Sequence, residues 1–207
     1  MPGAVHCDHW QTIGNSMSTL DGYPSTQLAL FFLFRIRALP SYCRRINQQF
    51  SSSHQPMLYP DLTAEENLLL YAKLYGVADP QKRVNELLDV VGLSHRRLDP
   101  VRTFSKGMTQ RVAIARAIVH DPAVVFLDEP YSGLDPHAVD IFDSLIADIR
   151  DEHTFVMVSH DLRKGFAMCS HALVLARGRV VSFDDKNALD FSEFSQLYRE
   201  TVGMGVA

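Results

Sequence analysis

Two adjacent carboxylates, Asp128 and Glu129, follow directly after the apolar residues 124–127, and Pro130 comes next. An apolar run that ends in paired acids is typical of a buried strand whose last side chains reach the edge of a sheet. One carboxylate of such a pair can hold a magnesium ion while the other polarises a water molecule, as in a nucleotide hydrolase. A strand that simply runs out into a polar loop looks the same, so the pair needs support from other motifs.

A second motif, F-S-K-G-M-T-Q-R-V at residues 104–112, predicts the start of a helix. Ser105 is a good helix cap, and Gly107 lies within the first turn. Free N–H groups and the helix dipole converge at such a start and favour an anion. Taken alone, the motif is explained equally well by a capped helix without a ligand.

Two further motifs follow the acids. Ser132-Gly133-Leu134-Asp135 comes directly after them, and Val158-Ser159-His160-Asp161 ends a second apolar run. A histidine at a strand end is usually a surface or hydrogen-bonding residue. Here His160 is predicted at the same sheet edge as Asp128, where open α/β sheets bind their ligands.

The rest of the pattern predicts the elements that position these side chains. Thr63 and Glu66 form a capping box that opens a helix ending near Gly76, and Asp79 with Pro80 opens a second helix. Strands that alternate with helices are typical of an α/β fold with a parallel sheet and crossover helices. Further helices are predicted over 105–120, 136–150 and 161–168, and strands over 123–127, 154–158, 172–176 and 179–183, with a tight turn at 177–178.

In this order the four motifs resemble those of the ATP-binding cassette (ABC) ATPases, over roughly residues 54–185. The resemblance implies a P-loop NTPase-like α/β fold, ATP and Mg²⁺ as ligands, and a head-to-tail dimer of two cassette subunits. It implies that Asp128 holds magnesium through water, that Glu129 is the general base, and that His160 contacts the γ-phosphate. Ser105 and Gly107 would belong to the signature loop, which clasps the nucleotide bound on the partner subunit, and Asp135 to the loop that couples the two sites.

Residues 55–76 resemble the family's loop and first helix of a small helical lobe, here about 61–103, that touches a membrane-spanning subunit. The glutamine that the family places at the start of this loop falls on His54, with Gln55 one residue late. The signature also departs from the family at three positions. Phe104, Lys106 and Met108 stand where leucine, glycine and glutamine are usual.

The form E-P-Y-S-G-L-D and the short chain resemble the ATP-binding subunit of the haem exporters associated with cytochrome c maturation. S-K-G-M is also common in multidrug and lipid exporters, so the cargo stays open.

Net charge is −4 and the pI is near 6.1, which provides no basic field for nucleic acid. The longest apolar run, residues 28–34, is far shorter than the about 20 residues of a transmembrane helix. We therefore expect a cytoplasmic protein that lies on the inner face of the membrane through a partner subunit.

The phosphate-binding loop G-x-x-x-x-G-K-S/T is missing from this sequence. No Gly-Lys dipeptide occurs, and the glycines before Gly76 are Gly3, Gly14 and Gly22. Residues 1–53 are accordingly interpreted as an atypical, poorly ordered segment, and 54–207 as an ABC ATPase domain whose phosphate loop has been truncated. The chain alone is predicted to be inactive.

Three explanations remain open. Residues 1–53 could come from a shifted reading frame or misplaced start in the gene of an ordinary cassette ATPase. Alternatively, the chain is a degenerate subunit that hydrolyses nothing and lends Ser105 and Gly107 to an intact partner. The ATPases of DNA repair and chromosome structure share the signature, but they carry long coiled coils, and no sustained heptad pattern occurs here.

Overall fold

The computed structural model describes residues 29–34, 57–176 and 179–203. The chain divides into two compact units: unit 1 comprises residues 1–34 and 158–207, and unit 2 comprises residues 35–157. Within the segment 1–53 the described part is the strand β1 (Ala29–Phe34), and His54 and Gln55 lie outside the described residues.

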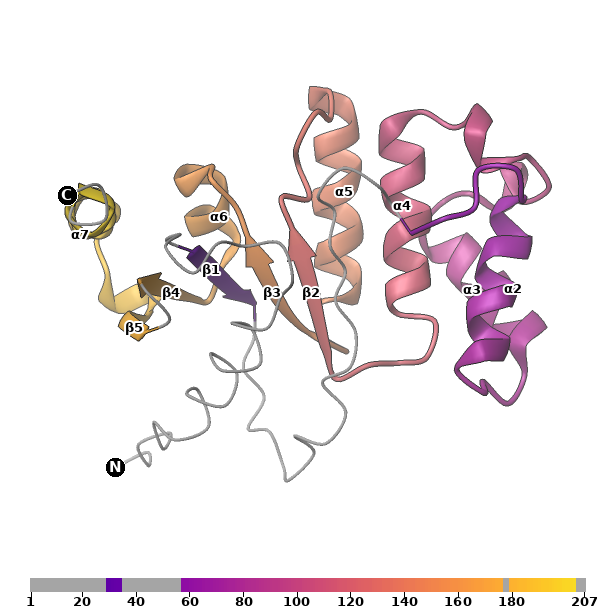
Figure 1. Cartoon of the computed structure of the whole chain (residues 1–207), viewed down its shortest axis with the longest axis horizontal. Coiled ribbons are helices and arrows are strands. Elements are labelled where there is room, and N and C mark those ends of the chain that lie inside the picture. Colours follow the sequence, from indigo (N-terminus) through magenta and orange to yellow (C-terminus); the bar gives the residue numbers. More distant parts are fainter. Residues whose placement is uncertain (1–28, 35–56, 177–178, 204–207) are drawn as a thin grey trace. The chain divides into compact units, whose positions relative to one another are not determined.

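Unit 2 begins with the helical lobe, which holds α2 (Ala64–Leu74), α3 (Pro80–Val90) and the short 3-10 helices η2 (Ser94–Arg96) and η3 (Val101–Thr103). The chain continues through α4 (Lys106–Ala117), β2 (Val124–Asp128), α5 (Pro136–Ile149) and β3 (Thr154–Val158, whose last residue falls in unit 1). Figure 1 shows α2 and α3 packed beside α4, and β2 and β3 running in the same direction with α5 as the connection between them. This is the βαβ crossover that the sequence predicts.

Unit 1 contains an antiparallel sheet. β1 pairs with β4 (His171–Ala176), and β4 pairs with β5 (Arg179–Asp185), with a register shift between Val174 and Leu175. The tight turn predicted at 177–178 requires β4 and β5 to run in opposite directions, and their antiparallel pairing confirms it. β1 lies in the segment for which the sequence predicted no element, so its pairing with β4 was not foreseen. The other elements of the unit are α6 (Leu162–Met168), η4 (Lys186–Ala188) and α7 (Phe191–Gly203).

The helix boundaries follow the capping residues. The predicted box is present, because the Thr63 hydroxyl accepts from the Glu66 N–H at 3.1 Å and the Glu66 carboxylate accepts from the Thr63 N–H at 2.8 Å. Asp79 likewise caps α3 by accepting from the Lys82 N–H at 3.1 Å. Among the described helices, none is both long and apolar enough to cross a membrane.

The core of unit 2 is built from the predicted apolar faces. Val84, Leu87 and Leu88 of α3 are at most 2% exposed, and α5 buries Phe142, Leu145, Ile146 and Ile149. Apolar periodicity also places Met108 on the buried side of α4 and Val139 on that of α5, and both predictions are wrong, because the two side chains are only half-buried. Both lie in the first turn or two of a helix, where side chains have fewer neighbours than in the middle.

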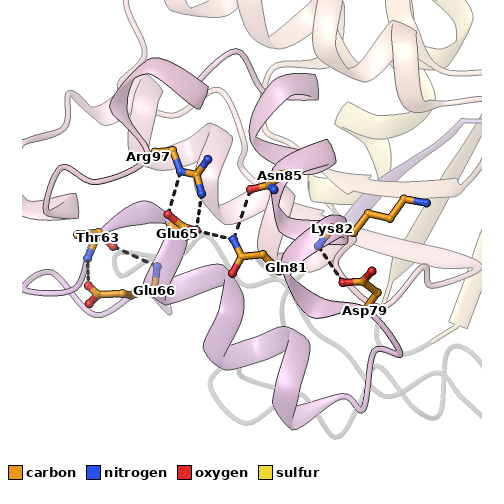
Figure 2. Close-up of polar contacts among 8 residues, drawn as sticks. All are labelled: Thr63, Glu65, Glu66, Asp79, Gln81, Lys82, Asn85 and Arg97. Atoms are coloured by element: carbon orange, nitrogen blue, oxygen red, sulfur yellow. Dashed lines mark hydrogen bonds and ion pairs between the residues drawn. The ribbon is translucent and has the colours of Figure 1, made fainter.

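A partly exposed ion pair between Glu65 and Arg97 holds the start of the lobe together, as Figure 2 shows. Glu65, in the first turn of α2, is 9% exposed and accepts from the Arg97 guanidinium at 2.9 and 2.6 Å and from the Gln81 amide at 2.5 Å. The hydrogen bond from Arg97 is the main cause that holds the pKa of Glu65 below its usual value of 4.5, against the opposing effect of burial. One carboxylate thus joins α2, α3 and the segment after η2.

We predict that this pair makes the lobe acid-labile. Because the pKa of Glu65 is lower in the folded than in the unfolded state, its stabilisation is present above about pH 4.5 and is lost as the pH falls through the folded value. Urea unfolding of Glu65→Gln should show a deficit against wild type that is largest near neutral pH and closes in acid. Asp148→Asn, which changes an exposed carboxyl on α5, should show no such deficit. A Glu65→Gln deficit that is constant with pH would contradict the assignment.

Candidate nucleotide-binding site

Strand β2 brings Asp128 to the edge of the core of unit 2. Val125 and Leu127 are 2% and 1% exposed, and Asp128, the last residue of the strand, is 9% exposed. Burial of the two apolar side chains fixes the strand, and the strand fixes the carboxylate. The sequence predicted this arrangement correctly.

Glu129 has a different conformation from its neighbour. Its φ is +46°, in the left-handed region that non-glycine residues seldom adopt, and Pro130 follows it. The chain turns back immediately, since the Ser132 N–H donates to the Glu129 carbonyl at 3.0 Å. Backbone strain of this kind gathers at functional sites and persists only where the surroundings enforce it. Asp128 therefore has the extended backbone of a strand, whereas Glu129, its neighbour, has a left-handed backbone.

Tyr131 anchors this turn to α5. Its hydroxyl donates to Asp143 Oδ1 at 2.8 Å, and its ring packs edge-on against Phe142 with the ring centroids 5.1 Å apart. Sequence reasoning missed this residue. A tyrosine after a proline has no local signal for a partner twelve residues later in a helix.

The predicted signature turn caps α4. The Ser105 hydroxyl accepts from the Met108 N–H at 3.2 Å, and the Ser105 carbonyl accepts from the Thr109 N–H at 2.9 Å. Gly107 is needed for a close approach of two helices. A Cβ at this position would lie 2.8 Å from the Cβ of Ala138 on α5, closer than real side chains come.

The S-G-L-D loop lies against the same turn. Gly133 has a φ of +69°, and the Lys106 ammonium occupies the space that a Cβ at residue 133 would need. Asp135 caps α5 by accepting from the Ala138 N–H at 2.9 Å. The structure thus brings the signature turn and the S-G-L-D loop together at the N-terminal ends of α4 and α5, a contact that we call the α4–α5 seam (residues 105–107, 133–135 and 138).

His160 belongs to unit 1. It is exposed between Ser159, which is 3% exposed and accepts from the Asp161 N–H at 3.2 Å, and Asp161, which caps α6. The imidazole lines an open cleft of about 590 Å³ together with residues of α6 and α7, among them Arg163 and Arg199. Of the predicted site residues, Asp128, Glu129, Ser105, Gly107 and Asp135 lie in unit 2, and His160 is described in unit 1.

The end of β2 fits magnesium through oxygen ligands. Mg²⁺ in nucleotide sites is held by one or two carboxylates together with water and substrate phosphates. Asp128 can supply such a carboxylate. Throughout the described part of the chain, no group of three His, Cys, Asp or Glu side chains could hold a metal ion unaided. Magnesium at Asp128 would accordingly need the nucleotide to complete its ligands.

Comparison with known proteins shows which family the chain is similar to. The model of the ABC transporter family matches residues 34–132. The linearmycin resistance ATP-binding protein LnrL of Bacillus subtilis is 33% identical over 135 residues, which are 64% of this chain and 43% of that protein. A fluoroquinolones export ATP-binding protein of Mycobacterium tuberculosis is 35% identical over 153 residues, 72% of this chain and 48% of that protein. The chain therefore spans about half the length of these curated relatives.

The fold agrees with this similarity. A solved ATP-binding subunit of an ABC transporter superposes with a TM-score of 0.59 and 29% identity, over 72% of this chain and 66% of the solved one. The ABC ATPase cassette, a P-loop NTPase fold, is therefore confirmed as the fold class.

We predict that Gly107→Ala weakens the α4–α5 seam. The added methyl group must displace Ala138, and overpacking of this kind costs about 1–3 kcal/mol of the free energy of unfolding. The better helix propensity of alanine offsets less than about 1 kcal/mol of this. In a double-mutant cycle measured by urea unfolding, Ala138→Gly should rescue part of the loss because it removes the opposing Cβ. Strict additivity of the two changes would contradict the contact.

Proposed function

We propose that this chain is an ATP-binding subunit that works in a head-to-tail pair with a second cassette subunit, since residues 34–132 match the model of the ABC transporter family. The single observation that carries the proposal is the α4–α5 seam beside the acidic end of β2. In unit 2 the structure groups the signature turn with the S-G-L-D loop, two motifs separated by the whole of β2 in the sequence.

The residue roles follow from the chemistry of their groups. Asp128 would hold magnesium through water, and the ion would neutralise phosphate charge. Glu129, on its strained turn, would polarise the attacking water, and His160 would contact the γ-phosphate. Ser105 and Gly107 would face a nucleotide held by the partner subunit, where α4 offers free N–H groups. Asp135 would couple the two sites because it caps the helix that packs on Gly107.

The missing phosphate-binding loop limits the role that the chain can have in a pair with a second cassette subunit. Without G-x-x-x-x-G-K-S/T in the sequence, the grip on the triphosphate must come from the partner subunit. The chain would then complete a site on an intact cassette and have little affinity for ATP by itself. His54 and Gln55 remain the candidates for sensing magnesium and water at the start of the lobe.

Transport would require a membrane-spanning partner that contacts the helical lobe at the inner face of the membrane. Relatives named for linearmycin resistance and fluoroquinolone export favour an exporter of small organic molecules. The haem-exporter type, suggested by E-P-Y-S-G-L-D, is the alternative cargo class. Cargo would pass through the membrane-spanning subunit, so no residue of this chain selects it.

We predict that this chain binds ATP weakly only because it lacks the phosphate-binding loop. Isothermal titration of the purified chain with MgATP should show no saturation below about 1 mM, which corresponds to about −4 kcal/mol. A chimera in which residues 1–53 are replaced by the phosphate-loop segment of the solved ATP-binding subunit should bind saturably and hydrolyse ATP. Glu129→Gln in the chimera should lower turnover by about 10²–10⁴-fold with binding retained, since it removes a general base.

Glu193→Gln, an exposed change on α7, is the matched control and should leave turnover unchanged. Tight MgATP binding by the natural chain, lost in Asp128→Asn, would refute the need for a partner's grip. A chimera whose turnover does not depend on Glu129 would refute the assigned role.

The abrupt change of character near residue 53 favours a second account, in which the segment before it comes from a shifted reading frame. Under that account the parent gene encodes an ordinary cassette ATPase. Translating the DNA upstream of codon 54 in all three frames should then reveal G-x-x-x-x-G-K-S/T in another frame. If no frame encodes it, the account fails and the degenerate subunit remains.

A further inference from the structure

His120 lies where the helical lobe meets the C-terminal end of α4. Its ring packs against that of Tyr75, the C-cap residue of α2, with the ring centroids 4.5 Å apart and the ring planes tilted by 36°. Its Nδ1 atom is buried and has no hydrogen-bond partner among the described residues. An imidazole held this way has no acceptor on that nitrogen to stabilise an added proton.

Two arginine side chains, one from α3 and one from α4, lie near this contact. Arg83 of α3 donates to the carbonyls of Ile118 and Val119, at 2.9 and 3.3 Å, and so neutralises the C-terminal end of α4. Arg116 of α4 is 5% exposed and lies over the ring of Tyr71 on α2, 4.9 Å from its centroid. The lobe is thus fastened to α4 by two guanidinium groups and aromatic rings around His120.

The other side of the contact is formed where the chain enters β2 and β3. His153 is 4% exposed, and its Nδ1 bonds the Pro122 carbonyl at 2.7 Å while its Nε2 is buried without a partner in the described residues. Asp121, with a φ of +54°, is the acidic neighbour of His120. The charged and titratable groups facing His120 are therefore Asp121, His153, Arg116 and Arg83, and Arg83 also lies 3.9 Å from the exposed Glu86 carboxylate.

We propose that His120 is a proton-sensitive joint between the helical lobe and α4. The neutral imidazole packs on Tyr75 and adds no charge beside Arg83 and Arg116. The imidazolium adds a positive charge beside Arg83 and Arg116 in a half-buried site, and the lobe loosens from α4. The inference is independent of the proposed nucleotide chemistry, because His120 contacts none of the residues assigned to it.

The direction of the pH effect follows from the environment. Burial lowers the pKa of His120 below its usual value of 6.5, with Asp121 opposing and His153, Arg116 and Arg83 reinforcing the effect. The unfolded or undocked chain therefore binds a proton first. Stability of the docked lobe is complete above about pH 6.5 and falls as the pH drops below it, by at most about tenfold in the docking equilibrium per pH unit.

Hydrogen exchange on the full chain tests the joint. After correction for intrinsic exchange, protection of α2 and α3 should fall by several-fold, and at most about tenfold, between pH 7.5 and pH 5.5, while β2 and α5 keep theirs. In His120→Phe, whose ring keeps the stacking on Tyr75 without a titratable nitrogen, lobe protection should not change with pH. His120→Gln supplies a second neutral variant in case one of the two disturbs folding. His95→Gln, an exposed change in the same lobe, is the control and should behave as wild type.

Three results would overturn the proposal. Lobe protection in the natural chain could be equal at both pH values. A fall could persist in both His120 variants, which would assign it to another group. An equal fall in the lobe, β2 and α5 would show a general loss of stability, with no joint at α4.

Discussion

The close approach of α4 and α5 at Gly107 is the constraint on which the candidate site depends. With no side chain at residue 107, Ala138 comes near enough to set the two helix starts side by side. The same approach places Lys106 over Gly133, whose left-handed backbone leaves room for the ammonium. Ser105 and Asp135 each cap one of the two helices, so a shift between the helices would move both motifs at once. The site in unit 2 therefore behaves as one rigid seam attached to the buried strand β2.

Charged groups hold the helical lobe together at its start and fasten its far end to α4. At its start, Glu65 joins α2 and α3 to Arg97, as drawn in Figure 2. At its far end, Arg83 and the ring pair of Tyr75 and His120 fasten it to the end of α4. The first contact depends on a carboxylate staying charged and the second on an imidazole staying neutral.

Local chemistry made much of this predictable from the sequence. The caps Thr63, Asp79 and Ser105 were identified because a capping side chain bonds an N–H three residues ahead. Asp135 and Asp161 cap their helices in the same way. The buried strand ending at Asp128 was identified from its apolar run.

What escaped prediction depends on tertiary contacts. No short-range pattern encodes the left-handed backbone of Glu129. The same holds for the hydrogen bond from Tyr131 to Asp143 and for the contact of Lys106 with Gly133, which join residues far apart in the sequence. The motifs identified the chemistry, and the packing of α4 on α5 determines how it is assembled.

The central claim is that this chain contributes its signature turn to a triphosphate bound by another subunit. A crystal structure of the chain mixed with an intact cassette subunit and MgATP tests it most directly. The account predicts Ser105 and the N–H groups of α4 on the phosphates of a nucleotide bound in the partner's phosphate loop. A nucleotide wrapped instead by residues 1–53 of this chain, beside Asp128, would contradict it.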